Sequence, residues 1–233
     1  MITRPASALR GLIAPARSLP TWESVEMGNW ISPAAAMQMV YDDPAGGNTD
    51  FGFALLRREA KGHSNSVLDL ARAKLQPREP TAQEAKAAEL PITTAAHRLV
   101  LAPGVGETDD IGAFFQGYDD NAPRRLKLLA VVMTMRFDND VMVHDMMSAA
   151  GSYAEMILAR QHRLSSLVVC HRPGEGLSAR APHAHVLCLS RTHRPSGFAE
   201  QNALFKGEAS DLHCNFMEEW RSFRTAWDRI AGQ

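Results

Sequence analysis

The feature that most constrains the fold is a long, largely apolar run over residues 126–137, with the sequence LKLLAVVMTMRF. Its apolar residues do not alternate strictly with polar ones, as they would in a strand with one exposed face. The length of the run and its valine-containing centre are typical of a strand that is buried on both sides. We therefore expect this run to form a central strand of a sheet.

Strand and helix patterns alternate around this run from about residue 96 onward. Further strands are expected where short apolar segments occur, over residues 98–102, 167–171 and 183–190. Helices are expected where apolar residues recur at helical spacing, over residues 138–159 and 210–230. Asp138 or Asn139 can cap the first of these helices. The pattern predicts an α+β fold, with a central antiparallel sheet and flanking helices.

The first part of the chain has a different character. Residues 34–41 predict a short helix with Pro33 in its first turn, and glycines and prolines punctuate much of the chain from there to Pro91. We therefore expect residues 1–95 to be a mainly helical or loosely ordered N-terminal extension. Residues 96–233 are then the core.

Composition excludes two classes of protein. The 233 residues are 45% apolar and 22% charged, and no apolar run approaches the roughly 20 residues that span a bilayer. A net charge of −1 excludes a uniformly basic nucleic-acid coat. Three cysteines without C-x-x-C spacing, and an N-terminus broken by prolines, indicate a reducing compartment and no signal peptide. We expect a cytoplasmic protein without a membrane partner.

The charge is unevenly distributed along the chain. Residues 1–120 contain 11 Lys or Arg against 15 Asp or Glu, whereas residues 121–233 contain 14 against 11. Within the second part, residues 160–206 contain seven basic residues, two acidic residues and five histidines. This distribution predicts a local basic surface near those histidines.

Three of these histidines are expected to meet. A His-x-His pair alone occurs by chance in a chain with nine histidines, but His183 and His185 begin an apolar strand and project from the same face of it. His171 ends the preceding strand, and a hairpin over residues 172–182 would bring it beside the pair. Three neutral imidazoles leave positions open for water or a phosphate oxygen. The pattern therefore predicts a catalytic metal site.

The surroundings of these histidines resemble a known family. A histidine ending one strand, a connecting loop, and then Pro182-His183-x-His185 followed by apolar residues are similar to the His-hydrophobic-His (HUH) endonucleases. Within that family the pattern most resembles the MobA/MobL plasmid-mobilisation relaxases. The order of strands and helices agrees, and Arg224-x-x-Trp227 is similar to a family motif in the following helix. The resemblance covers roughly residues 125–230.

The resemblance implies an activity, a cofactor and partners. A tyrosine hydroxyl would attack the scissile phosphate of single-stranded DNA at a transfer origin, forming a 5′-phosphotyrosine and releasing a 3′-hydroxyl. His171, His183 and His185 would hold a divalent ion, Mg²⁺ or Mn²⁺, that stabilises charge on the phosphate. Other mobilisation or relaxosome proteins are further implied partners. Backbone phosphates would be contacted by four basic residues, Arg172, Arg180, Arg191 and Arg194.

The order of the tyrosines selects the expected nucleophile. Tyr41, Tyr118 and Tyr153 all precede the histidines. Relaxases carry their tyrosine near the N-terminus, whereas the similar rolling-circle initiators carry it after the histidines. Tyr41 closes the segment SPAAAMQMVY, which is similar to the tyrosine-bearing helix of relaxases, so we expect Tyr41 to be catalytic. Tyr153 is expected to pack in the core and Tyr118 to lie in a loop.

Two departures from the family keep a second interpretation open. The family carries an acidic residue in its first central strand that orients a metal histidine, whereas residues 132–135 here read Val-Met-Thr-Met. Asp42 and Asp43 also follow Tyr41, where the family has basic residues. The alternative is a catalytically inactive, relaxase-like DNA-binding or accessory protein of a mobile element.

Overall fold

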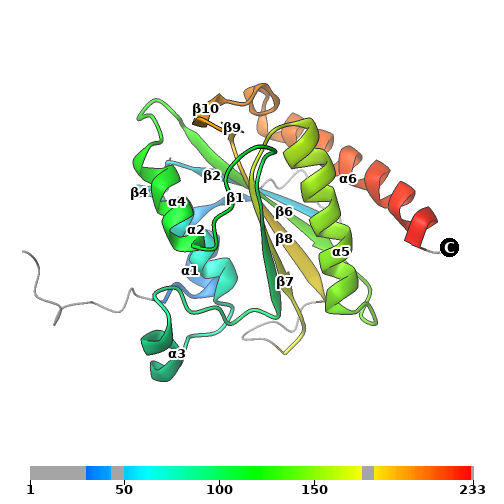
Figure 1. Ribbon diagram of the computed structural model, residues 1–233, viewed down its shortest axis with the longest axis horizontal. Helices are drawn as coiled ribbons and strands as arrows, with labels where there is room; N and C mark the ends of the chain where they lie inside the picture. Colours follow the sequence, from blue (N-terminus) through cyan, green and yellow to red (C-terminus); the bar gives the residue numbers. More distant parts are fainter. Residues whose placement is uncertain (1–29, 43–49, 175–180, 232–233) are drawn as a thin grey trace, which may run out of the picture.

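The computed structural model describes residues 30–42, 50–174 and 181–231, which are built around one antiparallel sheet (Figure 1). The sheet has six strands in the spatial order β1-β2-β6-β8-β7-β5. These strands are β1 (Tyr41–Asp42), β2 (Phe51–Arg57), β5 (Ala96–Val100), β6 (Leu128–Arg136), β7 (Ser166–His171) and β8 (His183–Leu189). Every neighbouring pair is antiparallel, so the predicted fold class is confirmed.

Helices cover both faces of the sheet (Figure 1). One face packs against α5 (Val143–Tyr153), its π-helical continuation η3 (Ala154–Gln161) and α6 (Ala209–Ala231). The other face packs against α1 (Pro33–Met39), α2 (Val67–Leu75) and α4 (Ile111–Asp120). The remaining elements are α3 (Ala82–Ala87), η4 (Ala203–Lys206) and the pairs β3–β4 (Glu59–Ala60, His63–Ser64) and β9–β10 (Arg191–Arg194, Gly197–Gln201). In the part of the chain that the structure describes, no helix has the length and apolarity to cross a bilayer.

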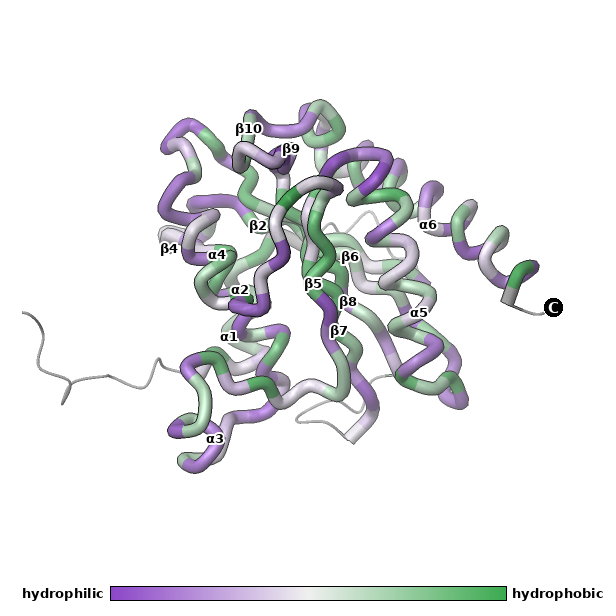
Figure 2. The backbone as a smooth tube through the Cα atoms, viewed as in Figure 1, coloured by the Kyte–Doolittle hydropathy of each residue, from purple (hydrophilic) through white to green (hydrophobic). Residues whose placement is uncertain are grey.

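Strand β6 shows why both faces need a helical layer. Val131 and Met133 belong to the apolar cluster under α5 and α6, whereas Ala130 and Val132 belong to the cluster under α2 and α4. Figure 2 shows the central strands mostly in the hydrophobic colour. The buried strand predicted over residues 126–137 is therefore confirmed as β6, and the predicted strands that carry the histidines are confirmed as β7 and β8.

Residues before position 96 contribute to the same sheet and to one of its layers. β2 pairs with β6 along its whole length, and α1 and α2 pack on the apolar cluster beneath them. Within the described residues, the boundary expected at residue 95 therefore does not separate an extension from a core. Gly52 makes the sequence of β2 (FGFALLR) less typical of a buried strand, and this strand is therefore not among those expected from the sequence.

Two helices differ from the sequence expectation. α5 begins at Val143 with Met142 at its N-cap, later than the predicted start at residue 138. α4 lies between β5 and β6, where no helix is expected from the sequence, and the carboxylate of Asp110 caps it by accepting a backbone N–H. Its buried residues recur at helical spacing, as Ile111, Phe115 and Tyr118 do, and that periodicity is the signal that identifies it.

The start of α2 is fixed by a residue from α4. The Asp119 carboxylate accepts hydrogen bonds from the Ser66 hydroxyl and from the backbone N–H groups of Val67 and Leu68, all at 3.0 Å. The Ser66 hydroxyl oxygen accepts a further bond from the N–H of Asp69. Three of the helix's otherwise unpaired N–H groups are thus satisfied, and the carboxylate also faces the positive end of the helix dipole.

We predict that Asp119→Ala lowers the free energy of unfolding by about 1–2 kcal/mol, because it removes a helix cap with three accepted bonds. Urea denaturation followed by circular dichroism measures this loss. Asp120→Ala is the matched control, since the Asp120 carboxylate accepts a bond from the exposed Gln116 side chain and caps no helix, and its loss should stay within about 0.5 kcal/mol. Equal losses in the two variants would contradict the capping role.

Candidate metal centre

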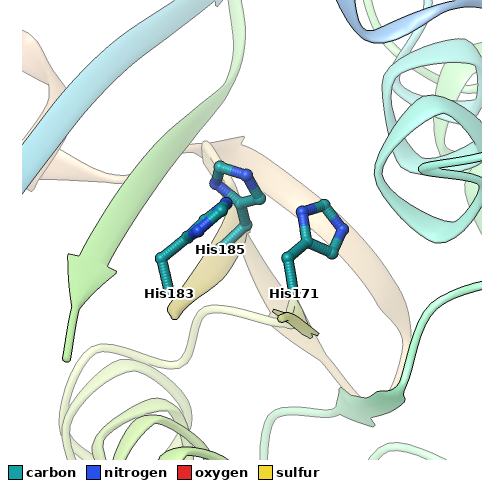
Figure 3. A group of neighbouring side chains, drawn as sticks. All are labelled: His171, His183 and His185. Carbon is teal, nitrogen blue, oxygen red and sulfur yellow. The ribbon is translucent and has the colours of Figure 1, made fainter. Parts of the chain in front are cut away.

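The three predicted histidines lie together at one end of the paired strands β7 and β8 (Figure 3). His171 is directly opposite His183 in the ladder, and Val169 is opposite His185. The three rings therefore project from the same face of the sheet, with centroids 4.8–5.2 Å apart. One nitrogen from each ring lies within 4.8 Å of the others. The predicted cluster is confirmed.

Burial keeps the cluster suited to metal binding. The three residues are only 7–9% exposed. The pKa of His171 is lowered to about 4, mainly by burial and to a lesser extent by the charges of His183 and Lys74, while a hydrogen bond to the Lys74 carbonyl opposes the shift. His171 is therefore neutral at pH 7 and keeps a lone pair for a ligand.

Two of the rings are oriented by backbone carbonyls. His171 Nε2 is 2.8 Å from the carbonyl oxygen of Lys74, and His183 Nδ1 is 2.9 Å from that of Ala181. A carbonyl only accepts, so each of these nitrogens carries the proton. The remaining nitrogens, Nδ1 of His171 and Nε2 of His183, hold the lone pairs.

The third ring is oriented by two side chains. His185 Nε2 is 3.4 Å from the Lys74 ammonium, which only donates, so Nε2 holds the lone pair. His185 Nδ1 then donates to the Thr134 hydroxyl at 2.9 Å. Thr134 thus orients this ring through a hydrogen bond. Gly52 gives Thr134 room, since a Cβ at position 52 would lie 3.3 Å from the Thr134 Cβ.

These contacts test whether the site fits a metal ion. Each ring carries a proton on its anchored nitrogen and offers the other nitrogen as a ligand, which is the usual arrangement around metal-bound histidines. Among the described residues the group contains three histidines and no carboxylate. A donor set of three imidazoles suits a transition-metal ion better than Mg²⁺, which prefers oxygen ligands. The three histidines could therefore hold a divalent metal ion.

The four predicted DNA-binding arginines are in different positions. Arg172 is exposed and directly follows His171, and Arg194 is exposed on β9, beyond the far end of β8. Arg191 is only 7% exposed, and its guanidinium donates to the carbonyl oxygens of Asn121, Phe198 and Ala199. These bonds give Arg191 a structural role instead of a place on a DNA surface. Arg180 lies outside the described residues.

The tyrosines are also separated. Tyr41 follows α1, which ends at Met39, and its backbone lies in β1 opposite Leu55. Tyr118 is fully buried on α4, not in the expected loop, and donates to the carbonyl oxygen of Leu129. Tyr153 is fully buried in the core, as expected, and donates to the Glu219 carboxylate. Burial raises the pKa of both buried phenols, so neither is a suitable nucleophile.

Comparison with solved structures finds a distant neighbour of this fold. It is a structure described as "Molecular Basis of Vancomycin Resistance Transfer in Staphylococcus aureus", which is similar at 14% sequence identity and a TM-score of 0.47, over 60% of this chain and 72% of that chain. No protein-family model matches the chain, and no curated protein matches it.

We predict that His183→Ala/His185→Ala weakens Mn²⁺ binding at least 100-fold, because it removes two of three ligands. Isothermal titration calorimetry with MnCl₂ measures the affinity. His144→Ala is the control, since the His144 side chain is 75% exposed and pairs with Asp145. Equal affinities in the double variant and the wild type would show that the histidines do not bind the ion.

Proposed function

We propose that this protein is a relaxase-type enzyme that nicks single-stranded DNA at the transfer origin of a plasmid or mobile element. The observation that supports this most is the histidine centre: three buried rings, converging from the adjacent strands β7 and β8, each oriented by a hydrogen bond. The order of a long strand, a helix and two histidine-bearing strands adds support, because it follows the pattern that the sequence resembles.

In this proposal Tyr41 is the nucleophile. Its hydroxyl oxygen attacks the scissile phosphorus, the bond from phosphorus to the 3′ oxygen breaks, and the tyrosine proton passes through solvent to the leaving 3′-hydroxyl. The product is a 5′-phosphotyrosine. A divalent ion would be held by His171, His183 and His185, and when bound it would screen the negative charge of the phosphate. Lys74 beside the centre and Arg172 after His171 add positive charge where the DNA backbone would lie.

A second candidate is the catalytically inactive, DNA-binding or accessory relative, and the position of Tyr41 favours it. Tyr41 pairs with Leu55 of β2. Leu55 is three residues from Gly52, and Gly52 is opposite Thr134 of β6, which is opposite His185 of β8. β1 is also three strands away from β8. Strand spacings of about 4.8 Å and rises of about 3.4 Å place the two backbones about 18 Å apart. Catalysis by Tyr41 therefore requires its segment to approach the histidines.

We predict that a labelled single-stranded origin oligonucleotide, incubated with the protein and Mn²⁺, forms an adduct that survives a denaturing gel. Tyr41→Phe should abolish the adduct, because it removes the attacking hydroxyl, and His183→Ala should reduce it at least 100-fold. Tyr118→Phe is the matched control.

Three results separate the candidates. An adduct that persists in Tyr41→Phe would show that another residue is the nucleophile. Salt-sensitive binding without an adduct, across a panel of origin sequences, would support the accessory protein. No binding of any single strand would contradict both.

A further inference from the structure

We propose that Lys74 makes metal binding at the histidine centre dependent on an anionic oxygen, such as one from a phosphodiester. This inference rests on the proposed function, since it concerns the same centre. It assigns to Lys74 the role of a positioning residue that couples two ligands.

Lys74 contacts two of the three histidines through different groups. It lies in the last turn of α2, where its carbonyl oxygen accepts the Nε2 proton of His171. Its ammonium lies 3.4 Å from Nε2 of His185. The residue is half-buried, because α2 packs over the face of the sheet that carries the histidines. Any ligand at the centre therefore meets this ammonium.

In the absence of an anion, the ammonium opposes metal binding in two ways. It donates to the lone pair of His185 Nε2, which the metal ion would also need, and one lone pair cannot serve both. It also places a positive charge a few ångströms from a divalent cation, and in a half-buried setting that repulsion weakens metal affinity by about tenfold or more.

An anionic oxygen reverses the sign of this interaction. An oxygen held between the ammonium and the metal ion attracts both, so the repulsion between the two cations is replaced by two attractions. A further basic residue is close to the centre, since Arg136 lies opposite His183 in the ladder. The metal and the anion should therefore each tighten the binding of the other by the same factor.

Such coupling has a chemical consequence for the proposed reaction. A centre that binds its metal ion weakly alone, and tightly together with a phosphate group, becomes complete only when DNA is present. Lys74 would then contact the phosphate after moving away from His185.

The test is a calorimetric titration of Mn²⁺ into the full chain, in buffer without phosphate and in buffer with inorganic phosphate. In the wild type we expect phosphate to tighten Mn²⁺ binding about tenfold or more. In Lys74→Met we expect tighter Mn²⁺ binding than in the wild type without phosphate, because the repulsion is gone, and a smaller effect of phosphate, because only its attraction to the metal ion remains. Lys74→Arg keeps the charge and should keep the phosphate effect.

Arg72→Met is the matched control, because it removes one charge from the same helix at a residue whose guanidinium is paired with Asp69 at 3.8 Å. It should behave as the wild type does. The absence of a phosphate effect in the wild type would overturn the inference even if Lys74→Met does not fold. Weaker Mn²⁺ binding by a folded Lys74→Met would also overturn it.

The titration also separates this inference from the proposed metal centre. Wild-type protein that binds no Mn²⁺ with or without phosphate would contradict the centre itself. Mn²⁺ that is bound through His183 and His185 but is indifferent to phosphate would contradict only the role of Lys74.

Discussion

The pairing of β7 with β8 is the constraint on which the rest of the site depends. The antiparallel register sets His171 opposite His183, and the pleat then puts His185 on the same face. A slip of β8 by one residue would turn both of its histidines to the opposite face. Such a slip would also exchange the smaller side chains of β8 in one cluster (Ala184, Val186 and Cys188) with the larger ones in the other (Leu187 and Leu189), so close packing on both faces holds the register. The hydrophobic core therefore positions the polar site.

The remaining contacts convert a cluster of histidines into a set of ligands. Thr134 comes from β6, Lys74 from α2 and Ala181 from the residues before β8, and each contacts one or two rings. Because these contacts fix which nitrogen is protonated, the lone pairs are available without reorganisation of the rings. α2 is itself held at its first turn by Asp119. The geometry of the centre thus depends on segments that are far apart in sequence.

The sequence predicts the part of this arrangement that rests on local pattern. β6, β7 and β8 can be predicted because they are largely apolar on both faces. Because side chains alternate between the two faces of a strand, His183 and His185 are also predicted to lie on the same face. The contacts of Lys74 and Thr134 with the histidines cannot be predicted from local pattern, because they form only when α2 and β6 pack against the histidine strands. For Arg191 the sequence suggests a contact that the structure does not favour. Its charge suggests a phosphate contact, but its guanidinium donates hydrogen bonds to three backbone carbonyl oxygens. The charge of a residue in the sequence does not indicate which neighbours compete for it.

Anomalous diffraction from crystals soaked in MnCl₂ would show whether the histidine cluster is a metal centre. We expect an anomalous peak at bonding distance from Nδ1 of His171 and from Nε2 of His183 and His185. We also expect the Lys74 ammonium to have moved away from His185. Difference maps without a peak at this position, at Mn²⁺ and phosphate concentrations that saturate calorimetric binding, would contradict metal binding by these histidines.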